Sequence, residues 1–274
     1  PIVGVELRVL DADDPDRAWP LCLLAMNLQG YRNLTLLISR AFTEGQHLGV
    51  PHVHKGWLQE CAEGVIALSA GAAGEVGQAL LGGRHDLAAE RLRQWMQLYP
   101  DRFYLELHRT GREGDEVHVH AAVALAGEMG CPVVATNDVR FLYPSEYEAH
   151  EARVCIHDGR TLNDPRPARL YTDQQYLRSP AEMAELFADI PEALANSVEI
   201  ARRCHLVLEL GRPYLPDYPV PAGMGVDEFF REQSRAGLER RLAVLLDPAA
   251  ANFAGQLVVY RARLEFELDT IIQM

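Results

Sequence analysis

A short apolar segment near the middle of the chain constrains the fold more than any other feature. Residues 133–135 form an apolar, mostly β-branched run that follows a Gly-Cys-Pro turn and ends in Thr-Asn-Asp at 136–138. Such a run is typical of a strand buried on both faces of a parallel sheet. Residues 115–129 and 145–157 show helical amphipathic patterns, so a helix–strand–helix unit is predicted. In folds of this kind ligands bind at the loop after the strand, where Asp138 lies.

The same alternation of strands and helices runs through the first part of the chain. Strands are predicted at residues 2–10, 21–26, 64–69 and 102–108, and helices at residues 29–42, 57–61, 75–81 and 86–99. Residues 43–55 lie between two of these elements and are interpreted as an irregular loop. This order predicts an α/β fold with largely parallel strands.

Beyond about residue 170 the pattern changes to helices. Ser179, Pro180 and Glu182 form a helix start signal, and residues 191–204 show a further helical repeat, followed by a short predicted strand at 206–210. We predict three parts: a first domain at 1–210, a linker rich in proline and glycine at 211–225, and a helical domain at 226–274.

Composition narrows the class of protein. A chain of 274 residues with 48% hydrophobic content can bury a large core, and its formal net charge of −13 argues against a nucleic-acid clamp. The five cysteines are scattered, which is typical of buried thiols in a reducing cytoplasm. No apolar run is long enough to cross a membrane and no signal peptide is recognisable. Because the chain begins at Pro1, without a start methionine, and stops within a helical pattern, we interpret it as a fragment cut at both ends.

The sequence contains two His-Val-His runs that resemble metal-binding motifs. We interpret their histidines as solvated or capping residues. His118 and His120 fall in a predicted helix, where positions two apart point roughly 200° apart and cannot share one ion. His52 and His54 lie in a predicted loop without a nearby Cys, Asp or Glu cluster. The glycine-rich run at 71–74 is a weak candidate phosphate site, because the Walker lysine and its Ser/Thr are missing.

Three acidic residues are better placed for chemistry. Glu6, Glu106 and Asp138 fall on predicted strands or strand ends, so they are candidates to meet at the mouth of a barrel. An equally acceptable interpretation is that these side chains only close strand ends by hydrogen bonding to backbone amides. No nucleophile is found beside a base.

Five segments resemble one protein family. They are residues 30–39 (GYRNLTLLIS), 133–141 (VVATNDVRF), 149–151 (AHE), 156–159 (IHDG) and 185–196 (ELFADIPEALAN). With them, essentially the whole chain resembles the alpha subunit family of the bacterial replicative DNA polymerase III, of the proteobacterial type. The resemblance implies a polymerase-and-histidinol-phosphatase (PHP) domain. Its expected fold is a distorted (β/α)7 barrel that here lacks its first strand–helix units, followed by helices leading into a polymerase palm domain.

The resemblance also implies where a metal site would lie. Metal-binding PHP domains carry clustered His, Asp, Glu and Cys ligands at the barrel mouth. Glu6 and Asp138 match acidic ligands, whereas Pro20, Gly71 and Arg140 stand at two histidine positions and one cysteine position. We therefore expect no metal and no other cofactor in this chain. We expect instead that Arg140 forms an ion pair with Asp138, or reaches Glu6.

The function implied by the resemblance is that of a part of a larger enzyme. The parent would be a DNA-directed DNA polymerase, a nucleotidyltransferase whose Mg²⁺-binding carboxylates lie beyond Met274. This part would be an inactive, metal-free platform for the proofreading exonuclease (epsilon) subunit, while the parent also meets primer–template DNA, the sliding clamp and the clamp loader. Residues 43–55 and 160–170 are candidate docking loops, although each reads equally well as a variable surface loop. The alternative is an independent metal-dependent PHP phosphoesterase or 3′–5′ exonuclease.

Overall fold

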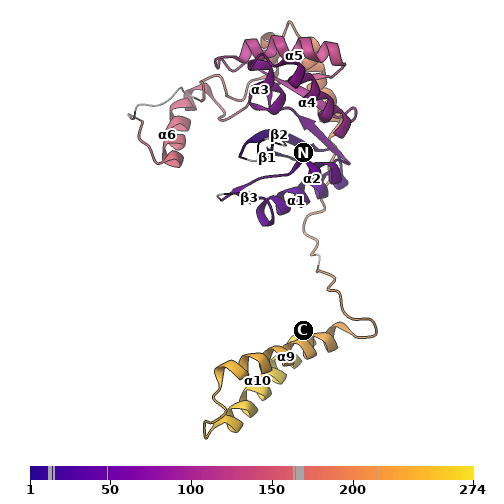
Figure 1. The fold of residues 1–274 in the computed structure, drawn as a ribbon, viewed down its shortest axis with the longest axis vertical. Helices are drawn as coiled ribbons and strands as arrows, with labels where there is room; N and C mark the ends of the chain where they lie inside the picture. The colour runs from indigo at the N-terminus through magenta and orange to yellow at the C-terminus, as the bar shows by residue number, and fades with distance from the viewer. Residues whose placement is uncertain (12–13, 15, 48, 163, 165–169, 214) are drawn as a thin grey trace. The chain divides into compact units, whose positions relative to one another are not determined.

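The chain divides into two units, each described separately below. The computed structural model describes residues 1–11, 14, 16–47, 49–162, 164, 170–213 and 215–274. Unit 1 comprises Pro1–Leu208 and unit 2 comprises Glu209–Met274 (Figure 1).

A five-stranded mixed sheet forms the centre of unit 1. Its strands, in spatial order, are β1 (Gly4–Leu10), β2 (Ala18–Ala25), β5 (Val65–Leu68), β6 (Phe103–His108) and β7 (Val133–Thr136). The pairs β5–β6 and β6–β7 are parallel, as predicted. The pairs β1–β2 and β2–β5 are antiparallel, so the prediction of largely parallel strands is wrong for the first half of the sheet. The connection from β1 to β2 is too short for the crossover that parallel neighbours need.

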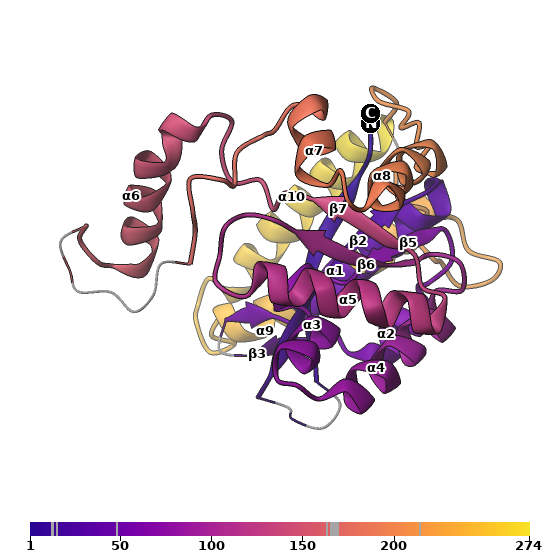
Figure 2. The ribbon, with the colours of Figure 1, turned by 90° about the horizontal axis from the view of Figure 1, so that it is seen from above.

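Helices and short turns complete unit 1. The helices are α1 (Leu28–Thr43), α2 (Lys55–Glu60), α3 (Glu75–Leu81), α4 (His85–Leu98), α5 (Asp115–Met129), α6 (Tyr147–Asp158), α7 (Pro180–Leu186) and α8 (Pro191–Arg203), with 3₁₀ turns at Gly71–Ala73 and Pro144–Glu146. The main core lies between the sheet and the helices other than α6, and includes Leu23, Leu37, Leu92, Leu105 and Leu107, all fully or almost fully buried. Helix α6 stands apart from the sheet and from the other helices of unit 1 (Figure 2).

Two local predictions are wrong. Residues 206–210 form no strand. The residue just before them, His205, donates a backbone hydrogen bond from its N to Met26 O at 2.9 Å. Both edges of β2 are already taken by β1 and β5, so the segment has no free strand beside β2 with which to pair. Residues 43–55 are not irregular throughout, because they contain a hairpin of β3 (Gln46–His47) and β4 (Val50–Pro51). Val53 then pairs with the outer edge of β1, which holds this hairpin against the sheet.

Unit 2 consists of a linker and a helical hairpin. The described residues between 209 and 225 form neither helix nor strand, and α9 (Val226–Leu245) and α10 (Phe253–Gln273) follow. The two helices have a small core in which Leu242 and Leu268 are buried. Four ion pairs link them among the described residues: Arg231 with Asp269 and with Glu265, Arg235 with Glu265, and Arg261 with Glu239.

Candidate functional site

A cavity of about 530 Å³ opens at the carboxyl ends of β5, β6 and β7. Of the five positions that the resemblance assigns to a metal site, four line it, namely Glu6, Pro20, Asp138 and Arg140, and the strand-end candidate Glu106 lines it as well. The fifth, Gly71, lies in the 3₁₀ turn after β5, and its neighbours on both sides line the cavity. The topology therefore brings together positions that are far apart in the sequence, as the barrel-mouth hypothesis required.

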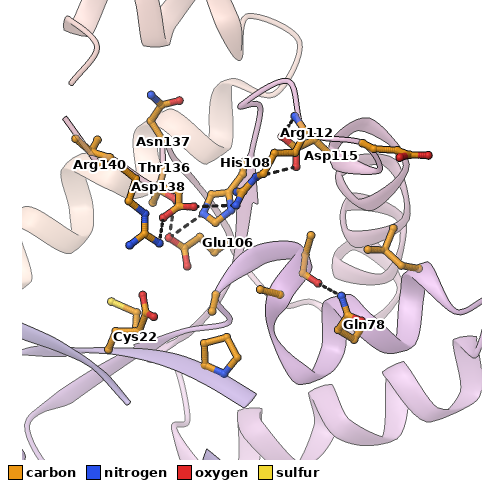
Figure 3. A pocket seen from close by; sticks show the side chains of 18 residues that line it. Cys22, Gln78, Glu106, His108, Arg112, Asp115, Thr136, Asn137, Asp138 and Arg140 are labelled. Carbon is orange, nitrogen blue, oxygen red and sulfur yellow. Dashed lines mark hydrogen bonds and ion pairs between the residues drawn. The ribbon is translucent and has the colours of Figure 1, made fainter. Parts of the chain in front are cut away.

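The carboxylate of Asp138 lies between two guanidinium groups (Figure 3). Arg140 Nη2 is 2.6 Å from Asp138 Oδ1, and Arg112 Nη1 is 3.0 Å from Asp138 Oδ2. Gln175 Nε2 also donates to Oδ2 at 2.8 Å. The expected pair of Asp138 with Arg140 is confirmed. Arg112 was not expected, because it comes from the loop between β6 and α5 and nothing in the local sequence pairs it with residue 138.

The backbone at Asp138 differs from the expected extended strand end. Its φ of 42° lies in the left-handed region, which aspartate adopts more readily than most non-glycine residues. Strand β7 ends at Thr136, so Asp138 and Arg140 meet across a turn rather than on one face of a strand.

A second carboxylate, Glu106, lies deeper in the cavity. Its Oε1 accepts a hydrogen bond from Thr136 Oγ1 at 2.6 Å. His108 Nε2 lies 3.3 Å from the same oxygen, within ion-pair distance but outside hydrogen-bond geometry. Burial acts to raise the pKa of Glu106, but the contacts with His108 and Thr136 outweigh it and hold this pKa below its usual value. Glu106 is therefore an ionised, internally satisfied carboxylate, held mainly by side chains and not, as the strand-end interpretation had it, by backbone amides alone.

The ring of His108 occupies the space beside Gly71. Gly71 has a φ of 56°, and a Cβ built on it would lie 2.5 Å from His108 Nδ1. A cysteine at position 71 would therefore collide with this ring. His108 is not among the residues that the sequence indicated, and its only signal is its place at the end of a predicted strand.

The side chains at this mouth do not fit a PHP metal cluster. The described residues include no group of three or more His, Cys, Asp or Glu able to hold a metal ion. Both carboxylate oxygens of Asp138 are engaged by guanidinium groups. Burial, together with the charges of Glu106 and Glu6, raises the pKa of Cys22 to about 12, so this thiol stays protonated and is a poor ligand. The expected absence of metal stays a prediction, to be tested by direct measurement.

The histidine pairs are arranged only partly as predicted. In α5, His118 is buried and His120 is exposed, so the two rings lie on different sides of the helix, as expected. The interpretation of these residues as solvated is wrong for His118 and for His52, which are 1% and 8% exposed. His118 lies on the inner face of α5, and His52 lies beside the β3–β4 hairpin. His54 is the N-cap residue of α2, without a side-chain cap hydrogen bond.

His118 is expected to make stability depend on pH. Burial, with a further contribution from His108, lowers its pKa to about 4. The unfolded chain, in which histidine titrates near pH 6.5, binds more protons than the folded chain as pH falls from about 6.5 to 4. Burial of His118 therefore does not reduce the free energy of unfolding above about pH 6.5. Between pH 7 and pH 5 the free energy of unfolding falls by about 2 kcal/mol.

Urea unfolding at pH 7, 6 and 5 measures this loss. His118→Leu should reduce the slope of unfolding free energy against pH, whereas His120→Gln on the exposed side of the same helix should leave it unchanged. Equal slopes for all three proteins would contradict the assignment.

Loss of Arg140 is expected to have a moderate effect on stability. Arg140→Ala should lower the free energy of unfolding by about 1–2 kcal/mol, because a charge-assisted bond is lost while Arg112 still pairs with Asp138. Arg93→Ala, at an exposed site on α4, should cost less than about 0.5 kcal/mol. Thermal unfolding of both variants compares them, and equal small losses would show that the pair is fully screened by water.

Comparison with known proteins places the chain in a family. The PHP domain family matches residues 1–110. DNA polymerase III subunit alpha of Pseudomonas aeruginosa is 54% identical over 274 residues, which is all of this chain and 23% of that protein. The subunits of Vibrio cholerae and Escherichia coli K12 are each 48% identical, again over the whole of this chain and 24% and 23% of their own lengths.

The chain thus spans less than a quarter of the length of these relatives. No helix among the residues that the structure describes is long and apolar enough to span a membrane. Identity of about half over the full length of the chain, together with the PHP match, goes well beyond a shared fold. The chain is therefore homologous over its whole length to part of the DNA polymerase III alpha subunit, and it belongs to that family as a segment carrying the PHP domain.

Proposed function

We propose that this chain is a structural and protein-binding part of a replicative DNA polymerase, and that its PHP mouth works without a metal cluster. The observation that carries the proposal is the Asp138 carboxylate held between Arg112 and Arg140. Two guanidinium groups balance the charge that a metal ion would otherwise balance. A cation placed there would meet two like charges, each repelling by roughly 1–4 kcal/mol at 4 Å for dielectric constants of 80 to 20.

The rest of the proposal concerns the parent protein. It would carry out template-directed DNA synthesis in the cytoplasm, with palm carboxylates holding Mg²⁺. Primer–template DNA, the sliding clamp and the clamp loader would be its partners. The five-stranded sheet would be part of a distorted (β/α)7 barrel, and α9 and α10 would lead toward the palm domain.

The partner proposed for this part is the proofreading exonuclease (epsilon) subunit. A domain that keeps its strands and helices but not the ligands of its metal site is suited to a docking role. The β3–β4 hairpin is one candidate contact, because it lies at the surface with Gln46 and His47 exposed. The other candidate loop, residues 160–170, lies largely outside the described residues.

A titration of this chain with the cognate exonuclease subunit tests the proposal. We expect saturable binding, weakened when residues 46–51 are replaced by a Gly-Ser turn if the hairpin is the contact. If the replacement leaves binding unchanged, the hairpin is not the contact, but the platform role stands. If the intact chain does not bind the subunit, the platform role is contradicted. A primer-degradation assay in the presence of Mn²⁺ or Zn²⁺ should show no nucleotide release. Metal-dependent release that is abolished by Asp138→Ala would instead support the phosphoesterase or exonuclease alternative.

A further inference from the structure

Residues 141–162 and 170–176, here called the arm, leave the body of unit 1 after β7 and return to it before α7. The arm contains α6, which stands apart from the sheet (Figure 2). The two ends of the arm lie side by side, with Leu177 N donating to Phe141 O at 3.0 Å and Arg140 N donating to Gln175 O at 2.8 Å. The arm is therefore joined to the body through a narrow stem, formed by residues 140–141 and 171–177.

Helix α6 packs against its own stem through a small aromatic cluster. The ring of His150 lies 5.6 Å from that of Phe141 and 4.6 Å from that of Tyr171. Phe141 begins the arm and Tyr171 lies close to its end, so α6 is fixed to both ends of the arm. Whatever fixes the stem to the body thus fixes α6 as well.

Polar side chains from both the stem and the body hold the two together. Gln175, which is fully buried, donates from Nε2 to Asp138 Oδ2 at 2.8 Å and to the Asp138 carbonyl at 3.2 Å. Asn137 Nδ2 donates to the carbonyls of Gln174 and Tyr176 at 2.9 and 2.8 Å. Thr172 Oγ1 donates to the carbonyl of Thr110 on the β6–α5 loop.

The side chain of Asp138 connects the stem of the arm to the β6–α5 loop of the body. Its carboxylate contacts Arg112 from the β6–α5 loop, Arg140 at the start of the stem, and Gln175 at the return of the stem. Arg140 in turn lies over the ring of Tyr171 at 5.6 Å, which extends the contact to the aromatic cluster. We propose that Asp138 anchors the arm to the body, and that the arm opens as one unit, with the sheet still folded, when this anchor is removed.

The inference is independent of the platform role, since it concerns only the internal stability of unit 1. Its physical basis is that segments with few contacts to the core open locally at a lower free energy than the core itself. The contacts of Asp138 are charge-assisted, so removing them should change such an opening by an amount that exchange methods can measure. The position that matches a metal ligand by resemblance is thus assigned a structural task.

Hydrogen exchange on the complete 274-residue chain tests the anchor. Asp138→Asn removes the charge and keeps the shape, and Gln175→Leu removes the amide that reaches Asp138. In both variants we expect the amides of α6 to exchange about tenfold faster, while those of β6 keep their rates. Asp86→Asn, on the exposed first turn of α4, is the matched control and should change neither.

Three outcomes would overturn the inference. They are unchanged exchange of α6 in both variants, equal acceleration of α6 and β6, and an α6 that is already unprotected in the unaltered chain. The first would show that Asp138 does not hold the arm, the second that opening is global, and the third that the arm is never held.

Discussion

Glu75→Ala is expected to lower the free energy of unfolding by about 3–5 kcal/mol, because it leaves the buried guanidinium of Arg91 and the partly buried ammonium of Lys55 without their partner. The Glu75 side chain is 5% exposed, and Lys55 Nζ and Arg91 Nε lie 2.8 and 3.2 Å from its Oε1. Trp95 Nε1 donates to Oε2 at 2.9 Å. Glu75 thereby joins α2, α3 and α4 at one buried point, and its loss would weaken all three attachments.

Glu60→Ala is the matched control. Glu60 pairs with Arg40 at 2.7 Å, but its side chain is 65% exposed, so solvent screens the pair and about 0–1 kcal/mol should be lost. Urea unfolding at pH 7 measures both variants. Losses of the same small size would show that water or rearranged side chains replace the buried carboxylate, and the proposed junction of the three helices would be wrong.

Gly71→Cys is expected to cost about 3 kcal/mol, although it introduces the residue that a metal-binding PHP domain would carry there. A left-handed φ costs a non-glycine residue roughly 1–2 kcal/mol, and overpacking costs about 1–3 kcal/mol more. The overpacking arises because the new Cβ would lie 2.5 Å from His108 Nδ1. Gly127→Cys on α5, where a Cβ would meet nothing within 4 Å, should change stability little.

A double-mutant cycle separates the two contributions at position 71. If the ring of His108 causes the collision, Gly71→Cys combined with His108→Ala should lose less than the sum of the single changes, by about 0.5–3 kcal/mol. Strict additivity would mean that only backbone strain acts there. A Gly71→Cys protein as stable as Gly127→Cys would contradict the described geometry of the turn.

Features governed by local sequence could be predicted well. The bounds of α3 and α5 agree with the structure, because capping, glycine placement and helical periodicity are all local. The Ser179 start signal is confirmed as a capping box, in which Ser179 and Glu182 each bond the backbone of the other. The meeting of Glu106 and Asp138 at one cavity followed from the rule that the carboxyl ends of parallel strands share an edge, whereas Pro20 was placed there only by the resemblance.

Contacts between distant segments could not be predicted from the sequence. Arg112 and Gln175 reach Asp138 from 26 residues before it and 37 residues after it, and neither has a local pattern that indicates this partner. The antiparallel start of the sheet also lacks a signal in periodicity alone, since a buried strand looks the same in either direction. His118 is the exception, because its spacing to Ala122 and Leu125 puts it on the apolar face of the helix, a local signal that the interpretation as solvated did not use.

Elemental analysis of the chain, purified without chelator, tests most directly whether this PHP mouth works without metal. The account predicts no stoichiometric zinc, manganese or iron, and the same trace content in Asp138→Ala as in the unaltered chain, because Arg112 and Arg140 already neutralise this carboxylate. A stoichiometric metal ion that is lost in Asp138→Ala would show that a cation displaces these guanidinium groups from Asp138. It would contradict the proposal that this mouth works without metal.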